Sequence, residues 1–228
     1  MFTKTPPVPI ELRRHSSAQP WTYADLDLRQ RQIAGDVRQG LPGALLISEV
    51  QPVITVGRRT PGQDLLLSHE KLEEQGISLH QTDRGGFATW HGPGQWVVFA
   101  VDRLEVLTDD RRGVRRAVEG LLSVALEVGL LWDKSAEIRS GCEMGVWGKT
   151  GKFAAVGVHI EQGVLLHGLA INAFKTPTSF VGLKPCGLDA PVSFLFDESL
   201  ARPKLERAFD ELKGEIIQAI FRHFWARA

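Results

Sequence analysis

Two cysteines, Cys142 and Cys186, supply all the thiol groups of this 228-residue chain. Cys186 follows a proline and precedes a glycine, so the sequence predicts that it lies on a rigid turn. A thiolate is a good nucleophile, but a free thiol with a pKa of about 8.5 needs a nearby cation to ionise at neutral pH. Lys152 and His91 are the available cations. The alternative is that Cys186 is a small buried hydrophobic residue, the commoner fate of a free cysteine. Cys142 is the competing thiol and has no second feature in its favour.

Lys152 opens an apolar, strand-like run that continues to Val158. A lysine at the edge of such a strand can be partly desolvated, which lowers its pKa from about 10.4 and lets it exchange protons near neutrality. The preceding Gly148-Lys149-Thr150 resembles the end of a phosphate-binding loop, but Glu143 occupies the position of the required first glycine. We therefore predict a proton-handling role for Lys152, against the alternative of an ordinary solvated lysine.

The segment from Arg84 to Gln95 combines arginine, histidine and glutamine with four glycines. Glycines let a backbone approach a ligand closely, and their N–H groups can hold a carbonyl oxygen or an oxyanion. We predict that this segment contacts a ligand. The alternative is a turn-rich connection with an incidental arginine and histidine.

Other kinds of site find little support in the sequence. His91, His159 and His167 form no close pair with metal-ligand spacing, and no C-x-x-C occurs, so we predict no metal site. No G-x-S-x-G motif occurs, which argues against a serine hydrolase.

Charge and composition limit the partners and the location. The chain has 27 basic and 27 acidic side chains, which disfavours nucleic acid and anionic membranes as partners. No apolar run approaches the roughly 20 residues that cross a bilayer, and the N-terminus lacks the apolar region of a signal peptide. With only two cysteines, a disulfide scaffold is excluded and a reduced compartment, the cytoplasm, is expected.

The elements that must position these residues follow from apolar periodicity. Helices are predicted over about 23–38, 112–127 and 203–226, with a shorter helical stretch over 68–75. Strands are predicted over 44–49, 53–56, 95–101, 152–160 and 164–173, the last two joined by a hairpin turn at 161–163. Strands interleaved with three substantial helices predict an α+β sandwich. We expect a single catalytic domain over 21–228, preceded by an extended, proline-containing arm over 1–20.

Taken in order, these motifs resemble the bacterial octanoyltransferase family, the lipoyl(octanoyl) transferases that start protein lipoylation. The resemblance covers about residues 45–195. It rests on four ordered motifs: Arg84-Gly85-Gly86 with Thr89-Trp90-His91 and Gly94-Gln95, Gly151-Lys152 with Ala154-Ala155-Val156-Gly157, His167-Gly168-Leu169-Ala170 with Asn172, and Pro185-Cys186-Gly187.

The resemblance implies a biotin/lipoate protein ligase-like sheet sandwich covered by helices. It implies that Cys186 attacks an octanoyl thioester on acyl carrier protein and forms an acyl-enzyme, while Lys152 lowers the pKa of the thiol and moves protons. A lysine of a lipoyl domain then receives the octanoyl group as an amide. The implied acceptors are the lipoyl domains of 2-oxoacid dehydrogenases and the glycine cleavage H protein; no cofactor is implied, and a monomer is expected.

The same resemblance assigns the substrate-binding residues to three segments. They are Arg84, Gly85, Gly86, Phe87, Ala88, Thr89, Trp90 and His91, then Ala155, Val156 and Gly157, then Gly168, Leu169 and Ala170. A medium-length acyl chain needs an apolar slot with few polar anchors, and small residues leave that space open.

Two pairs depart from the family pattern. Phe99-Ala100 stands where the family usually has Tyr-Pro, and Val192-Ser193 replaces the usual Thr-Ser. The second change removes a hydroxyl from the segment after Cys186.

Two other functions compete with the transferase. An ATP-dependent lipoate or biotin protein ligase shares the glycine-rich loop and the lysine but needs no catalytic cysteine. A non-catalytic acyl-binding protein could retain the same fold. Pro185-Cys186-Gly187 favours the transferase over the ligase, and the presence of both Cys186 and Lys152 argues against a non-catalytic protein.

Overall fold

The computed structural model describes residues 8–60, 64–184, 191–197 and 199–225. Within these ranges seven strands form one sheet. Their order is β1 (Ile10–Arg14), β2 (Ala44–Glu49), β6 (Gln95–Val101), β10 (Val164–Asn172), β9 (Gly151–Glu161), β8 (Gly145–Gly148) and β7 (Glu137–Arg139). β1 runs parallel to β2, and the other neighbouring strands are antiparallel.

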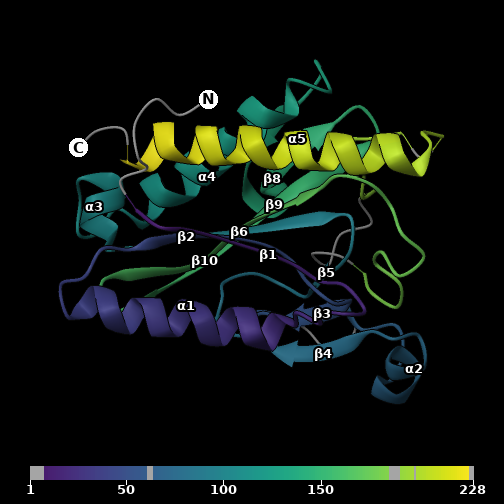
Figure 1. The fold of residues 1–228 in the computed structure, drawn as a ribbon, viewed down its shortest axis with the longest axis horizontal. Helices are drawn as coiled ribbons and strands as arrows, with labels where there is room; N and C mark the ends of the chain where they lie inside the picture. Colours follow the sequence, from purple (N-terminus) through teal and green to yellow (C-terminus); the bar gives the residue numbers. More distant parts are fainter. Residues whose placement is uncertain (1–7, 61–63, 185–190, 198, 226–228) are drawn as a thin grey trace.

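Helices cover both faces of this larger sheet. Figure 1 shows α1 (Tyr23–Arg38) on one side and α4 (Val114–Gly129) with α5 (Arg202–Ile220) on the other. Strand β6, the third in this order, is buried along its whole length, and its alternate residues enter two different cores because side chains alternate across a strand. Trp96, Val98 and Ala100 face α4 and α5, whereas Val97, Phe99 and Val101 face α1.

A smaller sheet lies on the α1 side of the molecule. Among the described residues its strands are β4 (Ser78–Gln81), β3 (Val53–Val56) and β5 (Thr89–His91), in that order, with α2 (His69–Glu74) connecting β3 to β4. Figure 1 shows β3 and β4 beside α1. This sheet has its own apolar core, formed by Ile54, Leu72, Ile77, Ala88, Trp90 and Leu183.

Helix α1 begins where the local sequence provides a capping box. The Thr22 hydroxyl accepts a hydrogen bond from the backbone N–H of Asp25, and the Asp25 carboxylate accepts one from the backbone N–H of Thr22. One face of the helix, including Tyr23, Leu26 and Ile33, is buried against the sheet. This placement carries the Tyr23 side chain toward the space between the two sheets.

The structure confirms the predicted α+β class and most of the long elements. Helix α1 and strands β2, β3 and β6 begin and end at the predicted residues, and β9 and β10 form the predicted hairpin. Helix α4 begins two residues later than predicted. The C-terminal helix ends at Ile220 and continues as a π-helical turn, Phe221–Trp225.

Several short elements were not predicted. They are β1, β4, β5, β7, β8 and α3 (Leu104–Thr108). Residues 10–14 lie in the segment expected to be an arm outside the domain, yet they pair with β2 from Ile10↔Leu45 to Arg14↔Glu49. Such short strands depend on pairing with a neighbour more than on their own sequence.

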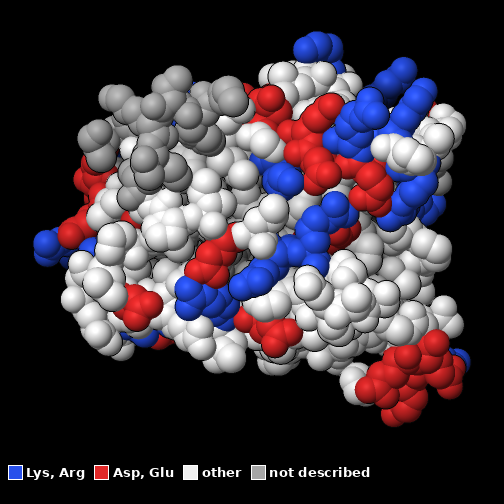
Figure 2. Space-filling view, in the orientation of Figure 1, with Lys and Arg blue, Asp and Glu red and all other residues white. Residues whose placement is uncertain are grey.

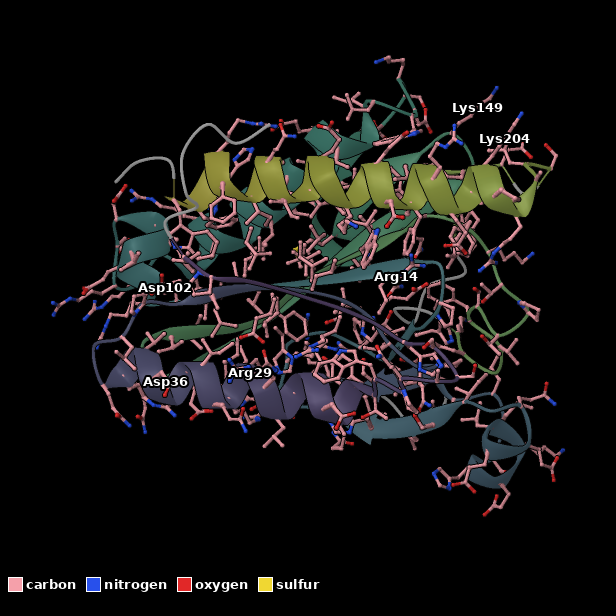
Figure 3. The ribbon with its side chains drawn as sticks, viewed as in Figure 1. Arg14, Arg29, Asp36, Asp102, Lys149 and Lys204 are labelled. Atoms are coloured by element: carbon pink, nitrogen blue, oxygen red, sulfur yellow. The ribbon has the colours of Figure 1, made fainter. Side chains whose placement is uncertain are left out.

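Charged groups of both signs share the surface. Figure 2 shows basic and acidic side chains close together on one face, with acidic side chains gathered over α2. Arg14 extends from β1 toward α5 (Figure 3), and its guanidinium bonds Glu49 at 2.7 Å and Glu206 of α5 at 2.9 Å. In the described part of the chain, no helix combines the length and apolar character needed to span a membrane.

Candidate active site

A cavity of about 290 Å³ lies between the two sheets. Its walls come from β6, β9 and β10 of the larger sheet, from the segment 84–87 and strand β5, and from residues 141–144. The volume is close to the lower limit of roughly 300 Å³ for small-molecule sites. A smaller cavity of about 30 Å³ shares Thr89, Lys152, Ala155 and Ala170 with it and reaches Gln95 and Asn172.

The floor of the cavity consists mostly of small residues that lie in register on neighbouring strands. Ala170 pairs with both Val97 and Ala155, and we call these three residues the alanine row. Two residues further along β10, Gly168 pairs with both Phe99 and Gly157, and we call these three the glycine row. Because directly opposed residues point to the same face of a sheet, the two rows together form an open trough.

The structure brings most of the predicted binding residues to this cavity. The residues that line it include Arg84, Gly85, Gly86, Phe87, Thr89, His91, Ala155, Val156, Gly157, Gly168, Leu169 and Ala170. Ala88 and Trp90 are not among them, because both are fully buried in the core of the smaller sheet.

Arg84 lines the cavity but its guanidinium bonds the protein itself. It donates to the backbone oxygen and the hydroxyl of Thr55, each at 2.8 Å, and to the backbone oxygens of Gly85 at 3.1 Å and Phe87 at 2.8 Å. The backbone N–H of Gly85 donates to the oxygen of Val158 on β9 at 2.9 Å. Arg84 therefore shapes the glycine-rich segment, which bridges the smaller sheet to the larger one.

Lys152 is held at one end of the cavity. Its ammonium donates to the backbone oxygen of Met144 at 2.6 Å. Gly145 makes room for the lysine stem, since a Cβ at this position would lie 2.2 Å from Cε of Lys152. Gly145 also has a φ of +152°, a backbone conformation that other residues rarely adopt.

Cys186 lies outside the described residues, but the chain that follows its segment pairs with Lys152. The backbone N–H of Lys152 donates to the oxygen of Pro191 at 2.9 Å, and the N–H of Ser193 donates to the oxygen of Lys152 at 2.9 Å. Val192 forms a parallel bridge with Lys152. Val192 stands where the family usually has threonine, but the next residue, Ser193, does carry a hydroxyl. This hydroxyl donates to the backbone oxygen of Gly151 at 2.7 Å.

The other thiol gains a feature that the sequence did not reveal. Cys142 is exposed and lines the same cavity as Lys152 and Met144. An experiment that assigns the nucleophile must therefore distinguish Cys186 from Cys142.

A chain of hydrogen bonds fixes the protonation of His91. Asn172 donates to the backbone oxygen of Ser193 at 3.2 Å, so its side-chain oxygen faces Gln95. Gln95 donates through Nε2 to that oxygen at 2.8 Å and to the backbone oxygen of Trp90 at 3.2 Å. The Oε1 atom of Gln95 therefore accepts from Nδ1 of His91 at 2.6 Å, and Nε2 of His91 is the unprotonated nitrogen.

Burial keeps the His91 imidazole neutral. The ring stacks on Tyr23 with centroids 5.2 Å apart and an interplanar angle of 14°. Burial, reinforced by the positive charge of Arg84, lowers the pKa of His91 from 6.5 to about 3. His91 is thus an acceptor at the cavity, and its low pKa argues against a role as the cation beside a thiolate.

His167 lines the cavity and is fixed by partners from α1 and from the segment between β4 and β5. Its backbone N–H donates to Oε1 of Gln30 at 2.8 Å, so Nε2 of Gln30 faces Nδ1 of the ring at 3.2 Å. The Tyr23 hydroxyl also lies 3.1 Å from Nδ1, and Nε2 of His167 lies 2.8 Å from Asp83. Burial lowers the pKa of His167, an effect that the Asp83 hydrogen bond partly opposes. The ring is therefore neutral, with Nε2–H donating to Asp83.

Asp83, His159 and Glu161 bring possible metal-ligand atoms within 4.8 Å of one another. Arg31 already bonds both carboxylates, at 3.0 Å to Asp83 and 3.2 Å to Glu161. A guanidinium between the two carboxylates supplies the positive charge that a metal ion would otherwise bring.

The sequence interpretation missed several residues that line the cavity: Tyr23, Arg59, Val97, Phe99, Gly141, Met144 and His167. Tyr23 and Phe99 look like core residues of a helix and a strand. His167 belongs to a motif of the family resemblance but was not assigned to the site.

Comparison with known proteins gives a consistent family. The model of the lipoyl protein ligase A/B catalytic domain matches residues 23–217. An octanoyltransferase of Corynebacterium glutamicum is 32% identical, with coverage of 94% of this chain and 90% of that protein. An octanoyltransferase of Rhodococcus opacus is 36% identical over 87% of this chain and 77% of that protein.

Solved structures with low sequence identity share the fold. A lipoate-protein ligase A bound with ATP superposes with a TM-score of 0.64 at 14% identity, covering 95% of this chain and 85% of that one. A biotin protein ligase of Leishmania major in complex with biotinyl-5-AMP gives a TM-score of 0.51 at 12% identity, covering 96% and 74%. These similarities confirm the predicted ligase-like fold.

Proposed function

Because the chain belongs to the octanoyltransferase family, within the lipoyl protein ligase A/B catalytic domains, and transfers octanoyl groups for protein lipoylation, we propose that it does so through a thioester on Cys186. In the first step the Cys186 thiolate attacks the carbonyl carbon of an octanoyl thioester on acyl carrier protein. A new C–S bond forms, the old one breaks, and the donor thiol leaves with a proton. The ε-amine of a lipoyl-domain lysine then attacks the acyl-enzyme, an amide forms, and the Cys186 thiolate is released.

The observation that carries this proposal is the pairing of Lys152 with the chain after Cys186. Lys152 lies at one end of an apolar trough and is hydrogen-bonded through its main chain to Pro191 and Ser193. We propose that its ammonium stabilises the Cys186 thiolate and lowers the pKa of that thiol. It would give a proton to the departing donor thiol and take one from the attacking amine.

The trough fits the substrate that this mechanism requires. Its floor consists largely of alanine and glycine residues, while the polar groups of Thr89, Gln95 and Asn172 lie at the Lys152 end. An octanoyl chain would place its methylenes over the floor and its thioester beside the polar end.

The proposed partners follow from the same chemistry. The donor is octanoyl-acyl carrier protein, and the acceptors are lipoyl domains of 2-oxoacid dehydrogenases and the glycine cleavage H protein. We propose that the enzyme acts as a monomer, because one chain supplies both Cys186 and Lys152. A free thiol nucleophile also suits the reduced cytoplasm that the sequence predicts.

Intact-mass spectrometry after mixing with octanoyl-acyl carrier protein tests the nucleophile. The wild type and Cys142→Ala should gain an octanoyl adduct, and Cys186→Ala should not. An adduct that persists in Cys186→Ala and disappears in Cys142→Ala would transfer the role to the exposed thiol at the cavity. Activity that requires ATP and free octanoate would instead favour the ligase alternative.

The role of Lys152 has a separate test. The rate of Cys186 alkylation against pH should shift toward higher pH in Lys152→Ala, because the thiol loses its neighbouring cation. Lys149, in the turn between β8 and β9, provides the matched control, and Lys149→Ala should leave the profile unchanged. Figure 3 shows that Lys149 lies at the edge of the molecule. An unmoved profile in Lys152→Ala would contradict electrostatic pairing.

A further inference from the structure

The two rows of the cavity floor differ in one side chain. The alanine row presents Val97, Ala170 and Ala155, all of modest size, whereas the glycine row presents Gly168, Gly157 and the large ring of Phe99. Phe99 is therefore the only bulky side chain in its row. It lines the cavity and is 3% exposed.

Surrounding aromatic rings hold the Phe99 ring in place. Its edge contacts include Tyr23, with centroids 6.3 Å apart, and His167, with centroids 5.5 Å apart. His167 is in turn hydrogen-bonded to Gln30 and Asp83. A ring packed against fixed neighbours cannot move aside for a ligand without disturbing them.

The strand register places Phe99 at the far end of the trough from Lys152. Lys152 and Gly157 are five residues apart on β9, which corresponds to roughly 17 Å along the strand. The alanine row lies between them, and the glycine row lies roughly 7 Å beyond it. In an extended polypeptide, three backbone bonds advance the chain by roughly 3.4 Å. An extended eight-carbon chain has seven C–C bonds and therefore spans roughly 8 Å.

We infer that Phe99 sets the length of the acyl chain that this enzyme accepts. The smaller cavity is lined by Lys152 together with Ala155 and Ala170, so the carbonyl lies over the alanine row. An octanoyl chain of roughly 8 Å then spans the roughly 7 Å to the glycine row, where its terminal methyl meets the Phe99 ring. Longer chains collide with this ring. The inference rests on the proposed function, because it takes the Lys152 end of the trough as the reacting end.

Two substitutions of opposite effect test the inference. Phe99→Leu replaces the ring by a smaller side chain and so lengthens the trough. It should raise the ratio of decanoyl to octanoyl transfer roughly tenfold or more, because one methylene in an apolar pocket changes rates roughly 10- to 200-fold. Phe99→Trp enlarges the ring at the closed end of the trough and should raise the ratio of hexanoyl to octanoyl transfer by a similar factor. The assay mixes hexanoyl-, octanoyl-, decanoyl- or dodecanoyl-acyl carrier protein with a lipoyl domain and weighs the product.

Val98→Ala is the matched control for a change in β6. Val98 is fully buried next to Phe99, but its side chain faces the α4 and α5 core. This variant should lose stability without changing either ratio. A Phe99→Leu enzyme that melts as one cooperative unit and keeps the wild-type ratio would overturn the inference. So would the same change of ratio in Val98→Ala.

A binding measurement separates this inference from the proposed function. If the wild type fails to transfer octanoyl groups from acyl carrier protein, the proposed function is wrong, but the trough can still be measured. Calorimetry with hexanoate, octanoate, decanoate and dodecanoate should show that Phe99→Leu shifts the best ligand toward longer chains. An unchanged order of fatty-acid affinities in Phe99→Leu would overturn the role of Phe99.

Discussion

Burial of the His91 ring makes the stability of this fold depend on pH in a calculable way. In the unfolded chain His91 titrates with its ordinary pKa of 6.5, whereas in the folded protein burial lowers the pKa to about 3. Between these two values the unfolded chain binds a proton that the folded protein does not bind. The stabilisation is therefore fully present above pH 6.5 and is lost as the pH falls toward 3.

The magnitude follows from about 1.36 kcal/mol per pKa unit. At pH 7 His91 is mostly neutral in both states. At pH 5 it is protonated only in the unfolded chain, so the free energy of unfolding falls by about 2 kcal/mol relative to pH 7. The full loss at still lower pH approaches about 5 kcal/mol.

Urea unfolding at several pH values measures this effect. His91→Asn keeps an amide that can donate to Gln95 but removes the titrating ring, so its fall in stability from pH 7 to pH 5 should be smaller by about 2 kcal/mol. His69 on α2, with a side chain 51% exposed, is the control, and His69→Asn should retain the wild-type slope. Equal slopes for His91→Asn and the wild type would refute a neutral, buried His91.

Three further substitutions test separate contacts. Thr22→Ala removes the N-cap of α1 and should lower the free energy of unfolding by about 1 kcal/mol in urea titrations, with no loss if the capping box is irrelevant. Gly145→Ala would place a Cβ 2.2 Å from Cε of Lys152 and should reduce octanoyl transfer at least tenfold, as expected for a misplaced catalytic group. The far-ultraviolet circular dichroism spectrum should stay unchanged. Normal transfer would contradict the tight placement of Lys152. Trp225→Phe removes the indole N–H that lies 3.0 Å from Asp102, a carboxyl whose pKa is raised by burial. The free energy of unfolding at pH 7 should fall by about 1–3 kcal/mol in thermal or urea unfolding. An unchanged midpoint would show that another donor replaces the indole.

Long periodic segments were predictable because their apolar pattern matches their burial. Helix α1 and strand β6 fall at the predicted residues, since each presents several buried side chains at regular spacing. The π-helical turn at Phe221 was not predictable in this way. It buries Phe221, Phe224 and Trp225, and contacts with the rest of the fold decide such a turn.

The site was predicted as a set of segments but not as a set of side-chain directions. The segment 84–95 was treated as a loop, and a loop implies no alternation of faces. In the structure β5 spans Thr89–His91, so Thr89 and His91 face the cavity while Trp90 enters the opposite core. A three-residue strand has too few residues to show this alternation in the sequence.

The cavity residues on α1 and β6 were hidden for a different reason. Tyr23 and Phe99 each occupy a position that fits ordinary core packing, and they do belong to the apolar core under α1. Only the register of β6 against β10 reveals that the partner of Phe99 is a glycine, which leaves the ring bordering empty space.

The hydrogen bonds from Asn172 through Gln95 to His91 restrict evolution and engineering at three positions at once. Each amide must both donate and accept, so a carboxylate of almost identical shape cannot replace either one at neutral pH. Asn172→Asp and Gln95→Glu would preserve volume and packing, yet each would replace an N–H donor by an oxygen that faces another acceptor oxygen. Sequence comparisons that score Asn/Asp and Gln/Glu as conservative pairs would misjudge them here, because each position needs a side chain that both donates and accepts a hydrogen bond.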